Sequence, residues 1–150
     1  MTGIRGIIVF CLILLIFFGW YIKANSMLTK EAIIETIDPW VKGNVTRRVL
    51  PDIESAAGRN NKEAIERLTK SITNIDYNSI TVKGFWEPLV VRSEITLNGE
   101  VPSDGSGVRY FYVEYDKILN RWVCGGGDLT TNCETNEFAY RNRFIVRKRW

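Results

Sequence analysis

The residues with the most distinct chemistry in this sequence of 150 residues are two cysteines near its end. Cys124 and Cys133 enclose the glycine-rich segment GGGDLTTN. A disulfide bond between them would close a short loop and restrict the unfolded chain, which stabilises a domain by about 2–3 kcal/mol. Such a bond forms in an oxidising compartment such as a periplasm or the cell exterior. The alternative is two unpaired thiols in a cytoplasmic domain.

Catalytic chemistry finds little support in the sequence. It contains no histidine, so the commonest general base and metal ligand is absent, together with Ser-His and Cys-His nucleophile pairs. The cysteines lack zinc-site spacing, and the glycines at 125–127 lack the lysine that follows in a phosphate-binding loop. Carboxylates are scattered rather than paired for acid–base work, as at Glu87, Glu94, Glu114 and Asp116. We expect no enzyme activity, no catalytic residue, no metal site and no cofactor.

The C-terminal tail carries a possible partner-binding surface. From 138 to 150, aromatic and aliphatic residues alternate with basic ones, which predicts a strand with one apolar and one basic face. The basic face comprises Arg141, Arg143, Arg147 and Arg149. It is either a solvated edge that deters pairing with other strands or a strip that meets an acidic partner or anionic headgroups. The net charge is only +3 and no aromatic residues interleave on this face, so we expect no nucleic-acid partner.

An apolar N-terminal segment indicates where in the cell the cysteine pair and the basic strip are located. Residues 6–22 contain no charged side chain; as a helix they reach about 25 Å, and short extensions would cover a hydrocarbon core of about 30 Å. Aromatic rings at one end suit the headgroup level. We predict a single-pass anchor over residues 1–24 that meets membrane lipid and other membrane proteins. Its candidate contact residues are Gly6, Phe10, Cys11, Leu15, Phe18, Trp20, Tyr21 and Ile22.

Other interpretations of this segment stay open. It could be a cleaved signal peptide, with Ile22-x-Ala24 as a cleavage site, or a buried helix of a soluble fold. Two sequence features also disagree about the membrane topology. Lys23 and Lys30 outnumber Arg5, which favours a cytoplasmic C-terminal domain, whereas the cysteine pair favours the opposite side. We follow the cysteines and expect a periplasmic or extracellular domain.

Residues 25–150 are expected to form one α+β domain, long enough for a single hydrophobic core. Apolar residues recur at helical spacing over about 27–75, for which Asn25, Ser26 and Thr29 are capping candidates. Breaks at Pro39 and Gly43 predict interrupted helices before a third helix near 62–75.

From residue 77 onward the hydrophobic period changes to two. Residues 89–97 alternate in this way, and so do residues 111–115. Turn residues such as Asn98-Gly99 separate the two segments. The pattern predicts an antiparallel meander of four to five strands over about 77–150.

Two features resemble the type IV pilins and pseudopilins. A short leader ends in Arg5-Gly6 directly before the apolar helix, and in that family a peptidase cuts after the glycine. Trp122-x-Cys124 followed by Cys133 resembles the disulfide-bounded loop near a pilin C-terminus. The resemblance implies a subunit of a filament or secretion system.

The chain departs from the pilin pattern at two positions. Ile7 and Cys11 stand where that family usually has phenylalanine and glutamate. Helices followed by a curved antiparallel sheet also resemble NTF2-like or cystatin-like domains, which some secretion-system and membrane-complex subunits carry. We therefore expect a structural or accessory subunit of a membrane or envelope complex, as a homo- or hetero-oligomer. A pilin-like subunit is the alternative.

Overall fold

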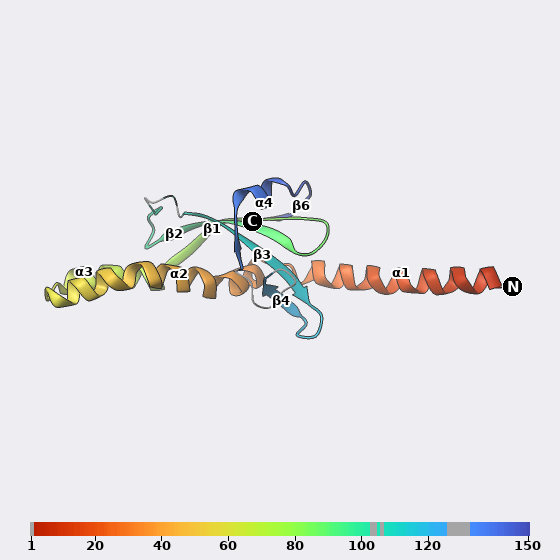
Figure 1. Ribbon diagram of the computed structural model, residues 1–150, viewed down its shortest axis with the longest axis horizontal. Helices are drawn as coiled ribbons and strands as arrows, with labels where there is room; N and C mark the ends of the chain where they lie inside the picture. Colours follow the sequence, from red (N-terminus) through yellow and green to blue (C-terminus); the bar gives the residue numbers. More distant parts are fainter. Residues whose placement is uncertain (1, 103–104, 106, 126–132) are drawn as a thin grey trace.

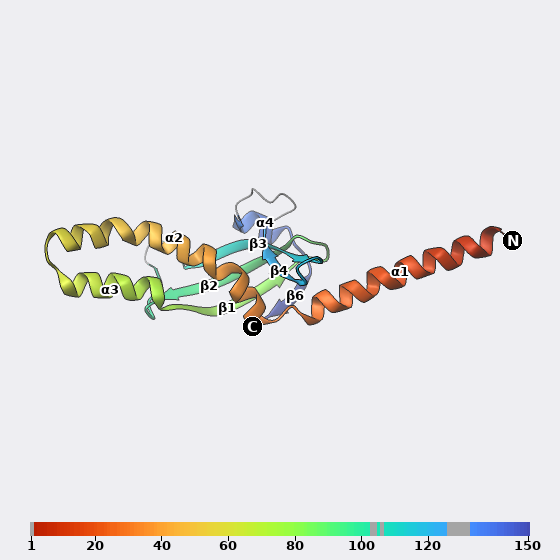
Figure 2. The ribbon, with the colours of Figure 1, turned by 90° about the horizontal axis from the view of Figure 1, so that it is seen from below.

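An N-terminal helix and a helical hairpin extend from opposite ends of a six-stranded antiparallel sheet (Figures 1 and 2). The computed structural model describes residues 2–102, 105, 107–125 and 133–150, with the backbone alone for residues 2–5. The chain is an α+β protein, as its sequence predicted.

Helices and strands follow one another in two groups. The first group is helical: α1 (Thr2–Ser26), α2 (Lys30–Gly58) and α3 (Lys62–Thr73). The second group forms the sheet and a short helix: β1 (Ile75–Lys83), β2 (Leu89–Leu97), β3 (Val108–Asp116), β4 (Arg121–Cys124), β5 (Glu134–Thr135), α4 (Glu137–Arg141) and β6 (Val146–Arg149).

Helix α2 is one uninterrupted helix, so the breaks predicted at Pro39 and Gly43 are wrong. Thr29 caps it as predicted, because its hydroxyl accepts a hydrogen bond from the Ala32 amide at 3.1 Å. Proline inside a helix costs about 3 kcal/mol. Each large aliphatic side chain that is fully buried contributes about 1.5–3 kcal/mol, and α2 buries four of them against the sheet. Tertiary packing therefore outweighs the local preference of Pro39.

Those four side chains recur at intervals of four residues: Ile33, Ile37, Val41 and Val45. Four residues advance the helix about 40° beyond a full turn, so this α2 stripe winds around the helix axis. The N-terminal half of α2 crosses the sheet in Figure 2, and the helix also packs against α3.

Helix α3 confirms the third predicted helix, although its apolar side chains are less buried than expected. Asn61 caps it by accepting a hydrogen bond from the Ala64 amide at 3.1 Å. Ala64, Ile65, Leu68 and Ile72 are all half-buried, and Ile72 packs against the core. The hairpin of α2 and α3 extends beyond the sheet in Figure 2, which leaves α3 little surface to pack on.

The sheet contains the predicted meander. Strand order is β4-β3-β2-β1-β6, and β5 pairs with β3 beside β4. Val91 lies opposite Val82 on one side and Phe111 on the other, and all three are fully buried. The period-two pattern therefore placed these strands and their inward faces correctly.

The single strand predicted over 138–150 is wrong in its first half. Residues 137–141 form helix α4, which Asn136 caps by accepting a hydrogen bond from the Ala139 amide at 3.0 Å. Only β6 is a strand, and it pairs antiparallel with β1 at the sheet edge. The expected apolar face does not form, because Phe138 and Phe144 are 75% and 92% exposed.

Replacing Ile37 by alanine removes a side chain with no exposed surface. We expect the unfolding free energy of the full-length chain to fall by about 2–5 kcal/mol. A guanidinium titration in detergent micelles, followed by tryptophan fluorescence, measures this loss. Leu50→Ala on the same helix is the control: Leu50 is 47% exposed, so its truncation should change stability by less than about 0.5 kcal/mol. Equal losses would contradict the burial of the α2 stripe.

Candidate functional site

Helix α1 is uncovered along almost its whole length. Every residue from 6 to 23 is exposed, including all eight predicted anchor residues. Within the described residues, one helical segment is long and apolar enough to cross a membrane, Gly6–Ser26. The last turn of α1 differs, because Ala24 and the following Leu28 are buried in the core of the domain. The helix therefore begins outside the domain and ends inside it.

Three segments of the domain contact the aromatic end of α1. From the β1–β2 loop, the ring of Phe85 lies 6.1 Å from that of Tyr21. From the β3–β4 turn, the Lys117 ammonium lies 4.8 Å from the centre of the Trp20 ring. From β6, the Arg147 guanidinium lies 4.7 Å from the Tyr21 ring. Cation–π contacts of this kind contribute about 0.5–1 kcal/mol at exposed sites.

Arg147 also fixes the end of α1 through a polar contact. Its Nε donates a hydrogen bond to the Asn25 Oδ1 at 3.0 Å. Asn25 was predicted as a capping residue for the next helix, but it lies in the last turn of α1 instead. We call this region, where Trp20, Tyr21 and Asn25 meet the domain, the α1 junction.

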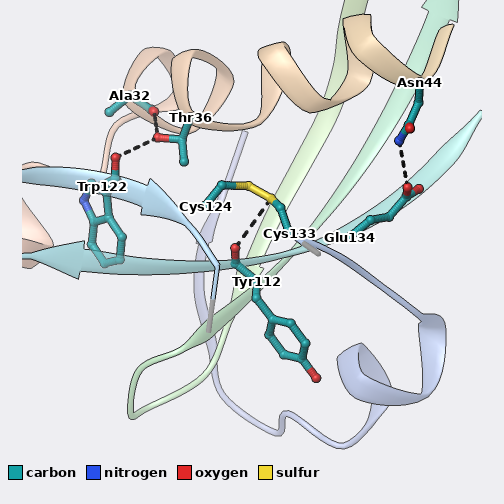
Figure 3. The surroundings of a disulfide bond; sticks show 8 residues. All are labelled: Ala32, Thr36, Asn44, Tyr112, Trp122, Cys124, Cys133 and Glu134. Carbon is teal, nitrogen blue, oxygen red and sulfur yellow. Dashed lines mark hydrogen bonds between the residues drawn. A yellow bond between two sulfur atoms is a disulfide. The ribbon is translucent and has the colours of Figure 1, made fainter. Parts of the chain in front are cut away.

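The two predicted cysteines are bonded to each other, Cys124 at the end of β4 and Cys133 just before β5 (Figure 3). Both strands pair with β3. The backbone of Tyr112 on β3 joins them further: its amide donates to the Cys133 carbonyl at 2.8 Å, and its carbonyl accepts from the Gly125 amide at 3.0 Å. The bond therefore connects two short strands that share one edge of β3.

Polar contacts attach this edge of the sheet to α2. The Thr36 hydroxyl lies 3.2 Å from the Trp122 carbonyl oxygen on β4. Glu134 on β5 accepts a hydrogen bond from the Asn44 amide at 2.9 Å and forms an ion pair with the largely buried Arg109. Figure 3 shows the Thr36 and Asn44 contacts on either side of the disulfide. The cysteine pair thus lies in a packed region where β4 and β5 meet α2.

The four arginines of the predicted basic strip do not share a strand face. Arg141 lies on α4 and pairs with Glu137 at 2.6 Å, while Arg143 donates to the Pro88 carbonyl oxygen. Arg147 is engaged at the α1 junction, and Arg149 lies on β6. The strip depended on one continuous strand, so it is lost where α4 replaces that strand.

The half-buried Tyr77 joins two elements of the domain through a hydrogen bond. The Tyr77 hydroxyl donates a hydrogen bond to Asp38 at 2.9 Å and joins β1 to α2. Burial, reinforced by the hydrogen bond and charge of Asp38, raises the pKa of Tyr77 far above its usual range, so the phenol remains a donor. Among the described residues, no cluster of three or more His, Cys, Asp or Glu residues could hold a metal ion.

Sequence reasoning missed the loop that contacts α1. Phe85 and Trp86 lie between Gly84 and Pro88 in the β1–β2 connection, and both aromatic rings are exposed. The available signal was two adjacent aromatic residues inside a turn, where polar residues are usual.

Comparisons with family models, with curated proteins and with solved structures found no match to this chain.

Reduction of the Cys124–Cys133 bond should lower the unfolding free energy of the full-length chain by about 2–3 kcal/mol, because it removes a short loop closure from the unfolded state. Guanidinium titrations with and without reductant, in the same detergent, measure the difference. Both use a Cys11→Ser background, since Cys11 is free and exposed on α1. Unchanged stability on reduction would contradict a structural role for the bond.

Proposed function

We propose that this chain is a non-enzymatic, single-pass membrane protein that serves as a structural or accessory subunit of a membrane or envelope complex. The observation that carries the proposal is the uncovered α1. Residues 6–22 carry no charged side chain and are all exposed, and the printed contacts with the domain involve only the end of this segment, at Phe17, Trp20 and Tyr21. An apolar helix of this length can cross a bilayer, because its side chains suit the hydrocarbon core and its backbone polar groups are hydrogen-bonded within the helix.

The end of α1 supports a retained anchor over a cleaved signal peptide. Cleavage after Ala24 would remove a side chain that is only 4% exposed and packs in the core. It would also remove Tyr21, the aromatic partner of Phe85 and Arg147. Cleavage of a segment that packs in the domain core in this way would destabilise the folded domain.

The disulfide supports a domain outside the cytoplasm, because reducing compartments keep thiols free. In a Cys11→Ser chain taken from its native membrane, denatured without reductant and treated with a thiol-reactive mass tag, we expect no labelling of Cys124 or Cys133. The same sample after reduction should gain two tags and is the control. Full labelling before reduction would place the domain in the cytoplasm.

Membership of a complex predicts that the chain leaves the membrane with partners. A tagged chain at native expression, extracted in mild detergent, should elute from size exclusion well above the mass of a monomer in its micelle. Mass spectrometry of that peak identifies the partners. An unrelated single-pass protein with the same tag and abundance is the control. Recovery as a monomer alone would contradict the subunit role.

A pilin-like subunit is the alternative, and the bonded cysteine pair after β4 favours it. Against it, α1 and α2 are separate helices with a turn at residues 27–29. Intact mass separates the two proposals, because pilin-type processing would remove residues 1–6 and a permanent anchor would keep them.

A further inference from the structure

Exposed apolar side chains gather at the end of the domain from which α1 leaves. The β1–β2 loop, the β3–β4 turn and the segment between α4 and β6 all lie toward this end in both views (Figures 1 and 2). The three segments carry most of the large exposed apolar residues that the structure describes on the domain. We call them the junction loops; their apolar residues are Phe85, Trp86, Ile118, Leu119, Phe144 and Ile145.

The degree of exposure is unusual for a domain in water alone. Trp86 is 75% exposed, Ile118 is 95% exposed and Phe144 is 92% exposed. Single exposed apolar residues are common, but a group of them at one end of a domain marks an interaction surface.

Contacts place the junction loops at one level of α1. Phe85 reaches Tyr21, and the neighbouring Trp86 lines a hollow that extends to Phe17, one helical turn further along α1. Lys117, directly before Ile118, reaches Trp20. These two loops therefore contact α1 at the level of residues 17–21.

The third segment is tied to the same level through the β1–β2 loop. The amide of Gly84 donates a hydrogen bond to the carbonyl of Ile145 at 2.9 Å. Arg143 donates to the carbonyl of Pro88 at the other side of that loop. Phe144 lies between these two attachments and is left with its ring exposed.

This level coincides with one end of the apolar span. Lys23 is the first charged residue after the span, about 3–9 Å beyond residues 17–21 along the helix axis. Tryptophan and tyrosine favour the headgroup region of a bilayer. If α1 crosses a bilayer, its boundary therefore meets the junction loops.

The charges around these loops favour lipid headgroups. Four basic residues lie at this end of the domain: Lys23, Lys117, Arg143 and Arg147. They exceed the acidic residues there, which are Glu87 in the same hollow, Glu114 near it, and Asp116 at the start of the β3–β4 turn. A surface with an excess of basic residues and with aromatic and aliphatic tips is the composition that binds an anionic membrane interface.

We propose that the junction loops insert into the headgroup region of the membrane that α1 crosses, so that the domain rests on the bilayer instead of hanging from a flexible tether. The inference depends on the proposed anchor role of α1. It adds a second membrane contact, made by the folded domain itself, and fixes the orientation of the domain.

Nitroxide labels on the full-length chain in phosphatidylcholine–phosphatidylglycerol nanodiscs test this proposal. One label is placed on the native Cys11, and others on Cys11→Ser chains that carry Trp86→Cys, Ile118→Cys or Leu50→Cys. Labelling without reductant leaves the Cys124–Cys133 bond intact. Collisions with oxygen and with a water-soluble nickel chelate report the depth of each label by electron paramagnetic resonance.

We expect the labels at 86 and 118 to collide with nickel several-fold less often than the label at 50. Leu50 is the matched control, since it is also exposed but lies on the helical hairpin at the opposite end. The label at Cys11 should be the deepest. Because Trp86 and Ile118 are exposed, their replacement should leave the fold intact, which circular dichroism checks.

Each contrary outcome has a distinct meaning. Nickel access at 86 and 118 equal to that at 50, with Cys11 deep, would overturn the insertion of the loops while the anchor stands. Nickel access at Cys11 would instead overturn the anchor role itself. Protection at 86 that is present in nanodiscs holding several chains and disappears in nanodiscs holding one chain would assign the surface to a second copy, which also overturns contact with lipid.

Discussion

The packing of the α2 stripe against the sheet is the interaction on which the rest of the structure depends. Ile33 and Ile37 have no exposed surface, and the strands beneath them contribute the other half of the same core. This packing keeps α2 continuous through Pro39 and holds the edge formed by β4 and β5 under the helix. It also fixes Leu28, and with it the point at which α1 enters the domain.

Several small contacts restrain α1 at the point where it enters the domain. Burial of Ala24, two cation–π contacts and the hydrogen bond from Arg147 to Asn25 all act within two turns of α1. Each is modest, but they come from separate segments of the domain and restrain the helix from different sides. A single contact would allow α1 to pivot, whereas this arrangement opposes rotation in more than one direction.

Sequence alone predicted what depends on local pattern. The alternation in 89–97 and 111–115, the cap at Thr29 and the cysteine pair are confirmed, because period and spacing determine them directly. Sequence-based prediction failed where tertiary packing or a single capping residue determines the local structure. Pro39 was taken as a break because the sheet that holds α2 was not yet known, and the tail was taken as one strand because the cap at Asn136 was overlooked. The α1 junction could not be predicted, since it joins residues that are far apart in the chain.

The helical hairpin of α2 and α3 makes the domain long in the direction away from α1. Helix α2 has 29 residues, so it is about 43 Å long, and its hairpin with α3 lies at the end opposite α1 (Figure 2). If α1 stands in a bilayer as proposed, a component bound at the hairpin tip would lie far above the lipid and would need no membrane segment of its own. The length of α2 would then contribute to the distance between the membrane surface and the far end of the domain.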